Sequence, residues 1–273
     1  MLNAGIPIVG KVLPDSILVR SMSPSLLLAL FGACLAAGLT FLLGFVPVQY
    51  LRAGFFTRHA LVAGLIWLGV AVVHFNLAFF FVAAACSLAW WNFRSDQMLQ
   101  GKLFLALAAG LGLTYGIFGA GLIRLPPLVP VSIQHWVIVG VYASAGLLAA
   151  GYLTLATAWS CNPADFRGRD LMQRQTGIFV IALIARTLIL GSALYVAYQD
   201  PEGNPLWEAL TQLGSLGWLL ALRVVCGLIV PALAALWIFT RLRRTLDEWE
   251  PKLILPMGAS LILGELIALR LGF

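Results

Sequence analysis

The chain has very little charge and few of the side chains that soluble enzymes use for chemistry. Asp, Glu, Lys and Arg make up only 10% of its 273 residues, and there are three His and four Cys. The cysteines stand singly, at Cys34, Cys86, Cys161 and Cys226, so no two have the spacing of a metal or cluster site. The sequence therefore predicts neither a metal site nor an iron–sulfur cluster in this chain.

The motifs of soluble enzymes are absent as well. The sequence has no glycine-rich phosphate loop after a strand, no paired acidic motif for magnesium and no nucleophile elbow. These absences argue against bond-making catalysis by this chain. Haem is not expected either, because His59 and His135 both sit at helix edges and His74 has no histidine at its own depth.

Hydrophobic residues are what the chain has in abundance. They make up 61% of the sequence, and the mean hydropathy is +0.96. Runs of about 20 apolar residues can cross a bilayer as helices. The sequence thus predicts an all-α, polytopic membrane helix bundle with seven transmembrane helices, which lie near residues 25–46, 59–91, 102–122, 133–158, 175–198, 214–240 and 253–272.

The run at 59–91 is the ambiguous one, because a helix of that length measures about 50 Å, well beyond the thickness of the hydrocarbon layer. We predict one long helix there. The alternative is a break near His74 and Asn76, which would give eight helices.

Lys and Arg indicate the orientation, because cytoplasmic loops retain them. With seven helices, residues 1–24 form a cytoplasmic amino-terminal tail, residues 25–273 form the bundle, and the carboxyl terminus lies outside. The net charge of +6 is then mostly explained by the basic residues of the cytoplasmic loops. Eleven basic residues fall on the cytoplasmic side (Lys11, Arg20, Arg94, Lys102, Arg167, Arg169, Arg174, Arg241, Arg243, Arg244 and Lys252) and four outside (Arg52, Arg58, Arg124 and Arg270).

Two charges lie inside the last two apolar runs, near the carboxyl end, where each costs about 2.5–3.5 kcal/mol at a helix centre. Arg223 is about 13 Å from the outer start of its run at Gly214, and Glu265 is about 10 Å from the outer end of its run at Gly272. Consecutive antiparallel helices usually pack together. We therefore predict a buried Arg223–Glu265 ion pair, whose role is either structural or in proton relay.

Other polar residues fall at the same outer level under this topology. Arg58, His59, Arg124 and His135 all stand at the start or end of an apolar run. Together they predict a proton-accessible pocket beneath the outer surface. Arg186 is different, because it lies about 12 residues into its run, near the bilayer midplane, with no obvious acidic partner.

Short motifs near the carboxyl end carry a family resemblance. The stretch Trp218-Leu-Leu-Ala-Leu-Arg223, followed by Gly264-Glu265-Leu266-Ile267, Arg270 and a terminal aromatic residue, resembles the dimethyl sulfoxide reductase membrane-anchor family. Glu265 matches the acidic position of that family. This part of the likeness falls within residues 218–273.

Three further stretches extend the likeness from Arg52 onward. Thr57-Arg58-His59-Ala60-Leu61 resembles the family's Thr-Arg-Glu-Ala motif, while Arg124-Leu-Pro-Pro and Gly151-Tyr152-Leu153 are similar to its middle section. The chain departs from the family in four ways. One of the family's eight helices is missing from the seven-helix assignment, its Glu is replaced by His59, its His-Leu-Gly motif is absent, and Arg270 follows Glu265 by five residues instead of four.

The resemblance implies a membrane anchor that exchanges electrons with menaquinone or ubiquinone, as in anaerobic respiration. Its partners would be an iron–sulfur subunit with four clusters and a molybdopterin catalytic subunit, in a bacterial or archaeal cytoplasmic membrane. Arg58, His59, Arg124 and His135 would contact the quinone, and Glu265 with Arg223 would relay protons. The alternative function is an ion- or proton-coupled transporter or channel that uses Arg186, Arg223 and Glu265.

Overall fold

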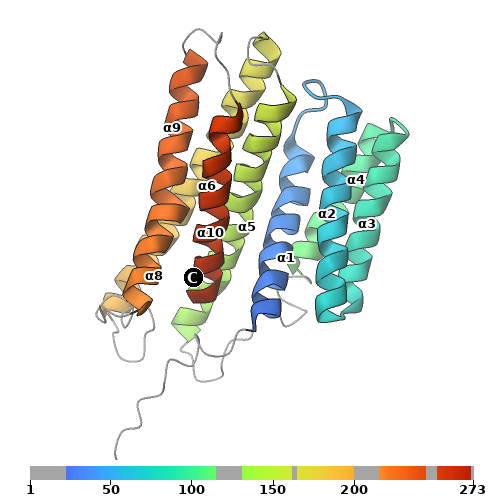
Figure 1. Ribbon diagram of the computed structural model, residues 1–273. Coiled ribbons are helices and arrows are strands. Elements are labelled where there is room, and N and C mark those ends of the chain that lie inside the picture. The colour runs from blue at the N-terminus through green and yellow to red at the C-terminus, as the bar shows by residue number, and fades with distance from the viewer. Residues whose placement is uncertain (1–22, 115–130, 162–164, 200–214, 244–250, 272–273) are drawn as a thin grey trace, which may run out of the picture.

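The structure, a computed structural model, describes residues 23–114, 131–161, 165–199, 215–243 and 251–271. Within these residues the chain forms helices and no β-strand, and the helices run side by side as one elongated bundle (Figure 1). A helix satisfies all of its backbone hydrogen bonds internally, which is what a lipid environment requires. The all-α prediction is therefore confirmed for the part of the chain that the structure describes.

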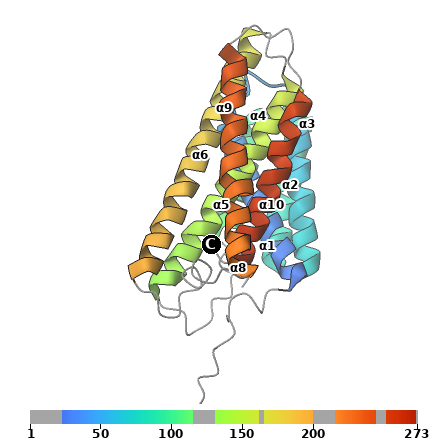
Figure 2. The same ribbon diagram turned by 60° about the vertical axis from the view of Figure 1, so that its left-hand side comes forward.

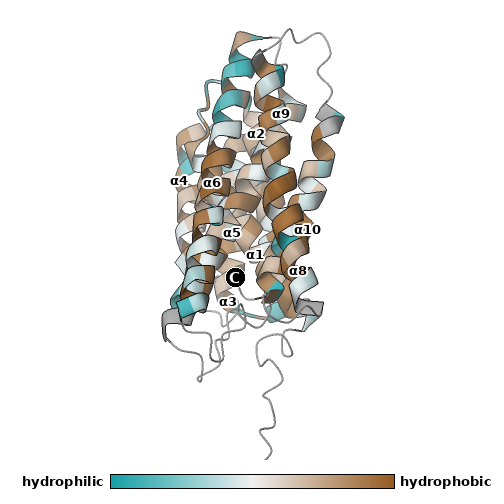
Figure 3. Ribbon diagram, turned by 90° about the vertical axis from the view of Figure 1, so that its left-hand side faces the viewer, coloured by the Kyte–Doolittle hydropathy of each residue, from teal (hydrophilic) through white to brown (hydrophobic). Residues whose placement is uncertain are grey.

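Six of the described helices are long and apolar enough to cross a membrane. Figure 3 shows hydrophobic residues over the middle of the helices and hydrophilic residues towards their ends. The chain thus has the helices of a multi-pass membrane protein. The six candidate spans are Pro24–Phe45, Ala53–His74, Leu77–Arg94, His135–Ser160, Phe166–Val196 and Gly217–Leu242.

The amino-terminal half of the bundle consists of α1 (Pro24–Phe45), α2 (Ala53–His74), α3 (Leu77–Arg94) and α4 (Met98–Leu111). Ser23 begins α1, because its hydroxyl accepts a hydrogen bond from the Leu26 backbone N–H. Helix α1 packs against α2 and α4, and α3 packs against the same two helices (Figure 1). These four helices therefore form a four-helix unit.

The carboxyl-terminal half consists of α5 (Val131–Ser160), α6 (Phe166–Gln199), α8 (Ser215–Val224), η2 (Val225–Ile229), α9 (Val230–Arg243), η3 (Pro251–Ile254) and α10 (Leu255–Leu271). The segments α8, η2 and α9 follow one another without a gap, and η2 is a π-helical turn. Figure 2 shows α9 in front, with α6 on one side of it and α10 on the other. Helix α5 packs against both α6 and α10, which completes a second four-column unit.

The two halves meet along α1 and α5, at a place where only glycine fits. A Cβ atom added at Gly38 of α1 would overlap the backbone carbonyl of Ala145 on α5. Small residues let membrane helices approach closely, and close packing stabilises helix pairs in lipid. Gly38 therefore fixes how closely the halves join.

The predicted single helix at 59–91 is wrong. Helix α2 ends at His74 and α3 begins at Leu77, and the two pack as an antiparallel hairpin. Phe75 adopts a left-handed backbone conformation with φ 35°, and the Asn76 side chain caps α3 by accepting from the Ala78 N–H at 2.9 Å. The local turn chemistry of Asn76 thus overrides the continuous apolar pattern around it.

This hairpin reverses every later helix relative to the seven-helix assignment. The start of α1, the α2–α3 turn and the end of α10 lie at one end of the bundle, whereas seven helices would place the chain ends on opposite sides (Figure 1). Arg58 consequently lies near the same end as Arg94, because the rings of Phe56 and Phe93 are 5.4 Å apart. We call this the basic end; its basic residues include Arg52, Arg58, Arg94, Lys102, Arg167, Arg169, Arg174, Arg241 and Lys252.

Candidate functional site

Three ionisable side chains are almost completely enclosed in the carboxyl-terminal half. Arg186 of α6, Arg223 of α8 and Glu265 of α10 expose 1%, 3% and 1% of their surface. Charged groups inside a membrane protein are costly to bury and usually serve a function. We call these three residues the buried charge cluster.

Arg186 and Glu265 form a two-pronged ion pair. The Arg186 Nε donates to Glu265 Oε1 at 3.3 Å, and its Nη2 donates to Oε2 at 3.2 Å. The third nitrogen, Nη1, donates to the Gly140 carbonyl of α5 at 2.9 Å. A fork-shaped guanidinium matches a carboxylate in this geometry, so the pair locks α6, α10 and α5 together.

The predicted Arg223–Glu265 pair is therefore wrong, because Glu265 pairs with Arg186. Depth along a helix says how far a side chain lies from the surface, but not which neighbouring helix it points towards. Helices α8 and α10 do pack together, as predicted, but Arg186 of α6 reaches the carboxylate of Glu265 instead. The signal that could have found the true partner was Arg186 itself, the charge nearest the middle of its run.

Arg223 is left with an unsatisfied donor. Its Nη1 is buried and has no hydrogen-bond partner within the described part of the chain. The Ser144 Oγ atom, on α5 one turn beyond Gly140, is also buried and has no hydrogen-bond partner among the described residues. Buried polar atoms without partners are rare in proteins and often indicate a bound ligand, ion or water.

The backbone beside the cluster is irregular and tightly packed. The π-helical turn η2 starts two residues after Arg223, and π-turns inside helices are frequent at functional sites. A Cβ added at Gly264 of α10 would overlap the Gly227 backbone of η2. A Cβ at Gly227 would meet only ordinary contacts, with Glu265 Oε1 at 3.9 Å. There is therefore no room for a side chain at position 264, whereas a small side chain at position 227 would fit.

A second polar group lies near the basic end. The His59 side chain is 8% exposed, its Nδ1 bonds the Phe55 carbonyl at 2.6 Å, and its ring lies 4.0 Å from that of Phe55 and 5.5 Å from that of Tyr152. Because Nδ1 is engaged by the backbone, Nε2 is the nitrogen left to meet a ligand. We call His59, Phe55 and Tyr152 the histidine site.

The predicted polar layer does not form as one group. On α5, His135 stands 17 residues before Tyr152, which is about 25 Å of helix. His59 and His135 therefore lie at opposite ends of the bundle. Arg58 is exposed and its Nε donates to the Gly54 carbonyl at 3.1 Å, while Arg124 lies outside the described residues.

The histidine site and the buried charge cluster are separate. Gly140, which binds Arg186, precedes Tyr152 by 12 residues, which is about 18 Å along α5. Within the described residues, no group of three or more His, Cys, Asp or Glu side chains is placed to hold a metal ion. The polar atoms at both places suit hydrogen bonding and proton transfer.

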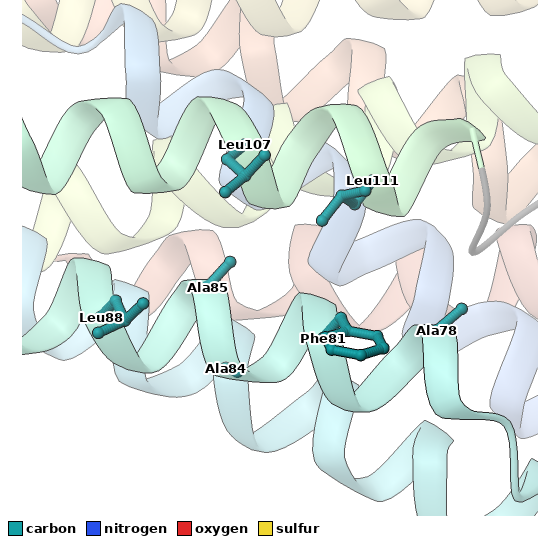
Figure 4. Close-up of a pocket in the computed structure, with 7 residues that line it drawn as sticks. All are labelled: Ala78, Phe81, Ala84, Ala85, Leu88, Leu107 and Leu111. Carbon is teal, nitrogen blue, oxygen red and sulfur yellow. The ribbon is translucent and has the colours of Figure 1, made fainter.

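Apolar grooves run along the outside of the amino-terminal half. One groove of about 560 Å³ lies between α3 and α4, and Figure 4 shows the side chains that line it. Another, of about 210 Å³, lies between α2 and α3 and begins at Ala60, the residue after His59. The lining of the first is almost wholly hydrocarbon, and that of the second is mostly hydrocarbon but includes Ser87; such linings suit a lipid chain or an isoprenoid tail. The first is lined by Ala78, Phe81, Ala84, Ala85, Leu88, Leu107 and Leu111.

Neither the family models, nor the curated proteins, nor the solved structures compared with this chain give a match.

Proposed function

We propose that this chain is the membrane-anchor and quinone-interacting subunit of a molybdopterin and iron–sulfur oxidoreductase complex. The observation that carries the proposal is the histidine site. A nearly buried imidazole, framed by the Phe55 and Tyr152 rings, stands at the position where the similar family has an acidic residue. An imidazole titrates near neutral pH and can exchange the protons that accompany quinone reduction.

A quinone also needs an apolar slot and a hydrogen-bond donor for its carbonyl oxygens. The groove that begins at Ala60 would hold the isoprenoid tail. Nε2 of His59 and the hydroxyl of half-buried Tyr152 would contact the head group. In this proposal Arg124 and His135 no longer share a site with His59, because His135 lies about 25 Å further along α5.

Glu265 keeps a proton-handling role in the proposal, with Arg186 as its partner instead of Arg223. The chain would cross the membrane eight times, which equals the helix number of the similar family. The positive-inside rule then places the basic end in the cytoplasm of a bacterium or archaeon, and the start of α1 and the end of α10 outside. The iron–sulfur subunit and, through it, the molybdopterin subunit would dock at one end of the bundle.

The decisive test is quinol-linked electron transfer in the isolated complex. His59→Ala should lower turnover at least about tenfold, the effect of losing one group that carries a proton. His74→Ala, at the other end of α2, is the matched control and should turn over normally. The wild-type complex should also contain iron and molybdenum. Unchanged turnover by His59→Ala in the assembled complex, or a preparation without either metal, would refute the proposal.

A second candidate is an ion- or proton-coupled transporter. It is favoured by one observation, namely that Arg186, Arg223 and Glu265 converge inside one half of the bundle. Flux across vesicles containing the chain alone would separate the two functions. A transporter moves ions without partner subunits, and Glu265→Gln should abolish that flux, whereas an anchor subunit shows no flux in either form.

A further inference from the structure

The buried charge cluster contains more positive than negative charge. Arg186 and Arg223 each carry one positive charge, and Glu265 carries one negative charge, so the enclosed sum is +1 if all three are ionised. A guanidinium does not give up its proton under ordinary conditions. An unbalanced charge shielded from water is costly, so it requires a counter-charge nearby.

The described parts of the surrounding helices supply no second carboxylate. Helices α1, α5 and α8 contain no Asp or Glu, and α10 contains only Glu265. On α6 the acidic residue is Asp170, which is 16 positions from Arg186 and forms an exposed pair with Arg174 at 3.0 Å. The charge of Arg223 is therefore not balanced by a side chain of these helices.

The unsatisfied donor points to where a counter-charge would sit. All three nitrogens of Arg186 are engaged, two by Glu265 and one by Gly140. Arg223 Nη1 is the nitrogen of the buried charge cluster that has no partner among the described residues, and it belongs to the residue without a counter-charge. The Ser144 hydroxyl, on the Gly140 face of α5, is a second unpartnered donor.

We infer that Arg223 binds a small monovalent anion of halide size, with Ser144 as a candidate second donor. The occupant must be small, because all three charged residues are at most 3% exposed. A single negative charge brings the enclosed sum to zero, and a guanidinium N–H makes a strong charge-assisted hydrogen bond. The site involves no quinone, so it stands or falls independently of the proposed function.

The test is a halide titration of the purified full chain in detergent, with no quinone present. Chloride or bromide replaces gluconate at constant ionic strength, and the midpoint of thermal unfolding is followed by tryptophan fluorescence. A ligand that binds the folded state raises this midpoint in a saturable way. We expect such a rise for the wild type and for Arg223→Lys, which keeps the charge.

Arg223→Gln should weaken the halide affinity about tenfold or more, the effect of losing one charge-assisted hydrogen bond. Arg174→Gln, at an exposed pair on the same half, is the matched control and should keep the wild-type response. Should Arg223→Gln fail to fold, Arg223→Met removes the charge and keeps the apolar bulk of the side chain. A wild type that melts identically in halide and gluconate, or a halide response that survives either neutral variant, overturns the inference.

Discussion

The two halves of the bundle differ in how buried charge is used: among the described residues, fully buried charges join helices only in the carboxyl-terminal half, whereas short buried side chains bond within their own helix in both halves. In the amino-terminal half, Thr40, His59 and Asn92 each bond a backbone carbonyl three or four residues earlier in their own helix. In the carboxyl-terminal half, Arg186 bonds Glu265 and Gly140 on two other helices. The first arrangement leaves each helix self-sufficient, whereas the second makes three helices depend on one another.

This difference concerns how the helices of each half are held together. Self-satisfied helices associate through shape and close contact, as lipid-facing helices generally do. Helices joined by buried charge cannot separate without exposing that charge to hydrocarbon. The carboxyl-terminal half therefore holds its helices by electrostatics around a site, and the amino-terminal half offers smooth apolar grooves to the membrane.

The largest effect is expected from Glu265→Gln, which breaks the cross-helix pair. It leaves two enclosed guanidinium groups without a carboxylate, and breaking a buried pair from one side typically costs about 3–5 kcal/mol. The free energy of unfolding in detergent should fall by that amount. Asp170→Asn, which removes an exposed pair of the same half, should change it by less than about 1 kcal/mol.

The double variant Arg186→Met with Glu265→Met sharpens the same point. Replacing both partners by apolar residues removes the pair without leaving half of it unpaired, and such replacements are often neutral. We expect the double variant to be more stable than Glu265→Gln by about 2 kcal/mol or more. If both proteins lose the same stability, the pair does not hold the carboxyl-terminal half together.

A smaller effect is expected from the glycine contact between α10 and η2. Gly264→Ala places a methyl group against the Gly227 backbone, and overpacking of this kind costs about 1–3 kcal/mol. Gly227→Ala is the matched control, because its methyl group would meet only ordinary contacts. The thermal midpoint should therefore fall for the first variant and stay close to wild type for the second. If both variants lower the thermal midpoint equally, the close contact between Gly264 and Gly227 is not the cause.

The sequence predicts the helices of this chain better than it predicts the contacts between their side chains. The apolar runs predicted the helices well, because lipid forces such runs to be helical; the run at 25–46 is α1, and the run at 133–158 is α5. The side-chain partner of Glu265 was not predictable, because hydropathy says nothing about which side of a helix faces which neighbour. Arg186 and Glu265 are 79 residues apart, and only the tertiary arrangement brings them together.

The break at Asn76 shows a different limit. Asn is a good helix cap, but a single cap competes with a long apolar run, and the run alone favours continuity. Predicting no break there shifted every later loop to the other side. One residue thereby moved His59 from the predicted outer layer to the basic end, and separated it from His135.

The smallest predicted effect tests the amino-terminal half through that residue. Asn76→Ala removes the cap of α3 and should lower the free energy of unfolding by about 1 kcal/mol, the usual cost of losing such a cap. Asn76→Ser, which can still cap, should lose less. Because this cap bonds only the first turn of α3 and touches none of the buried charge cluster, the loss should remain local and leave the halide titration of Arg223 unchanged. A loss of stability as large as that of Glu265→Gln, or a shifted halide titration, would mean that the two halves are energetically coupled across the α1–α5 contact. The halves would then differ in the bonding of their buried side chains but would not unfold as independent units.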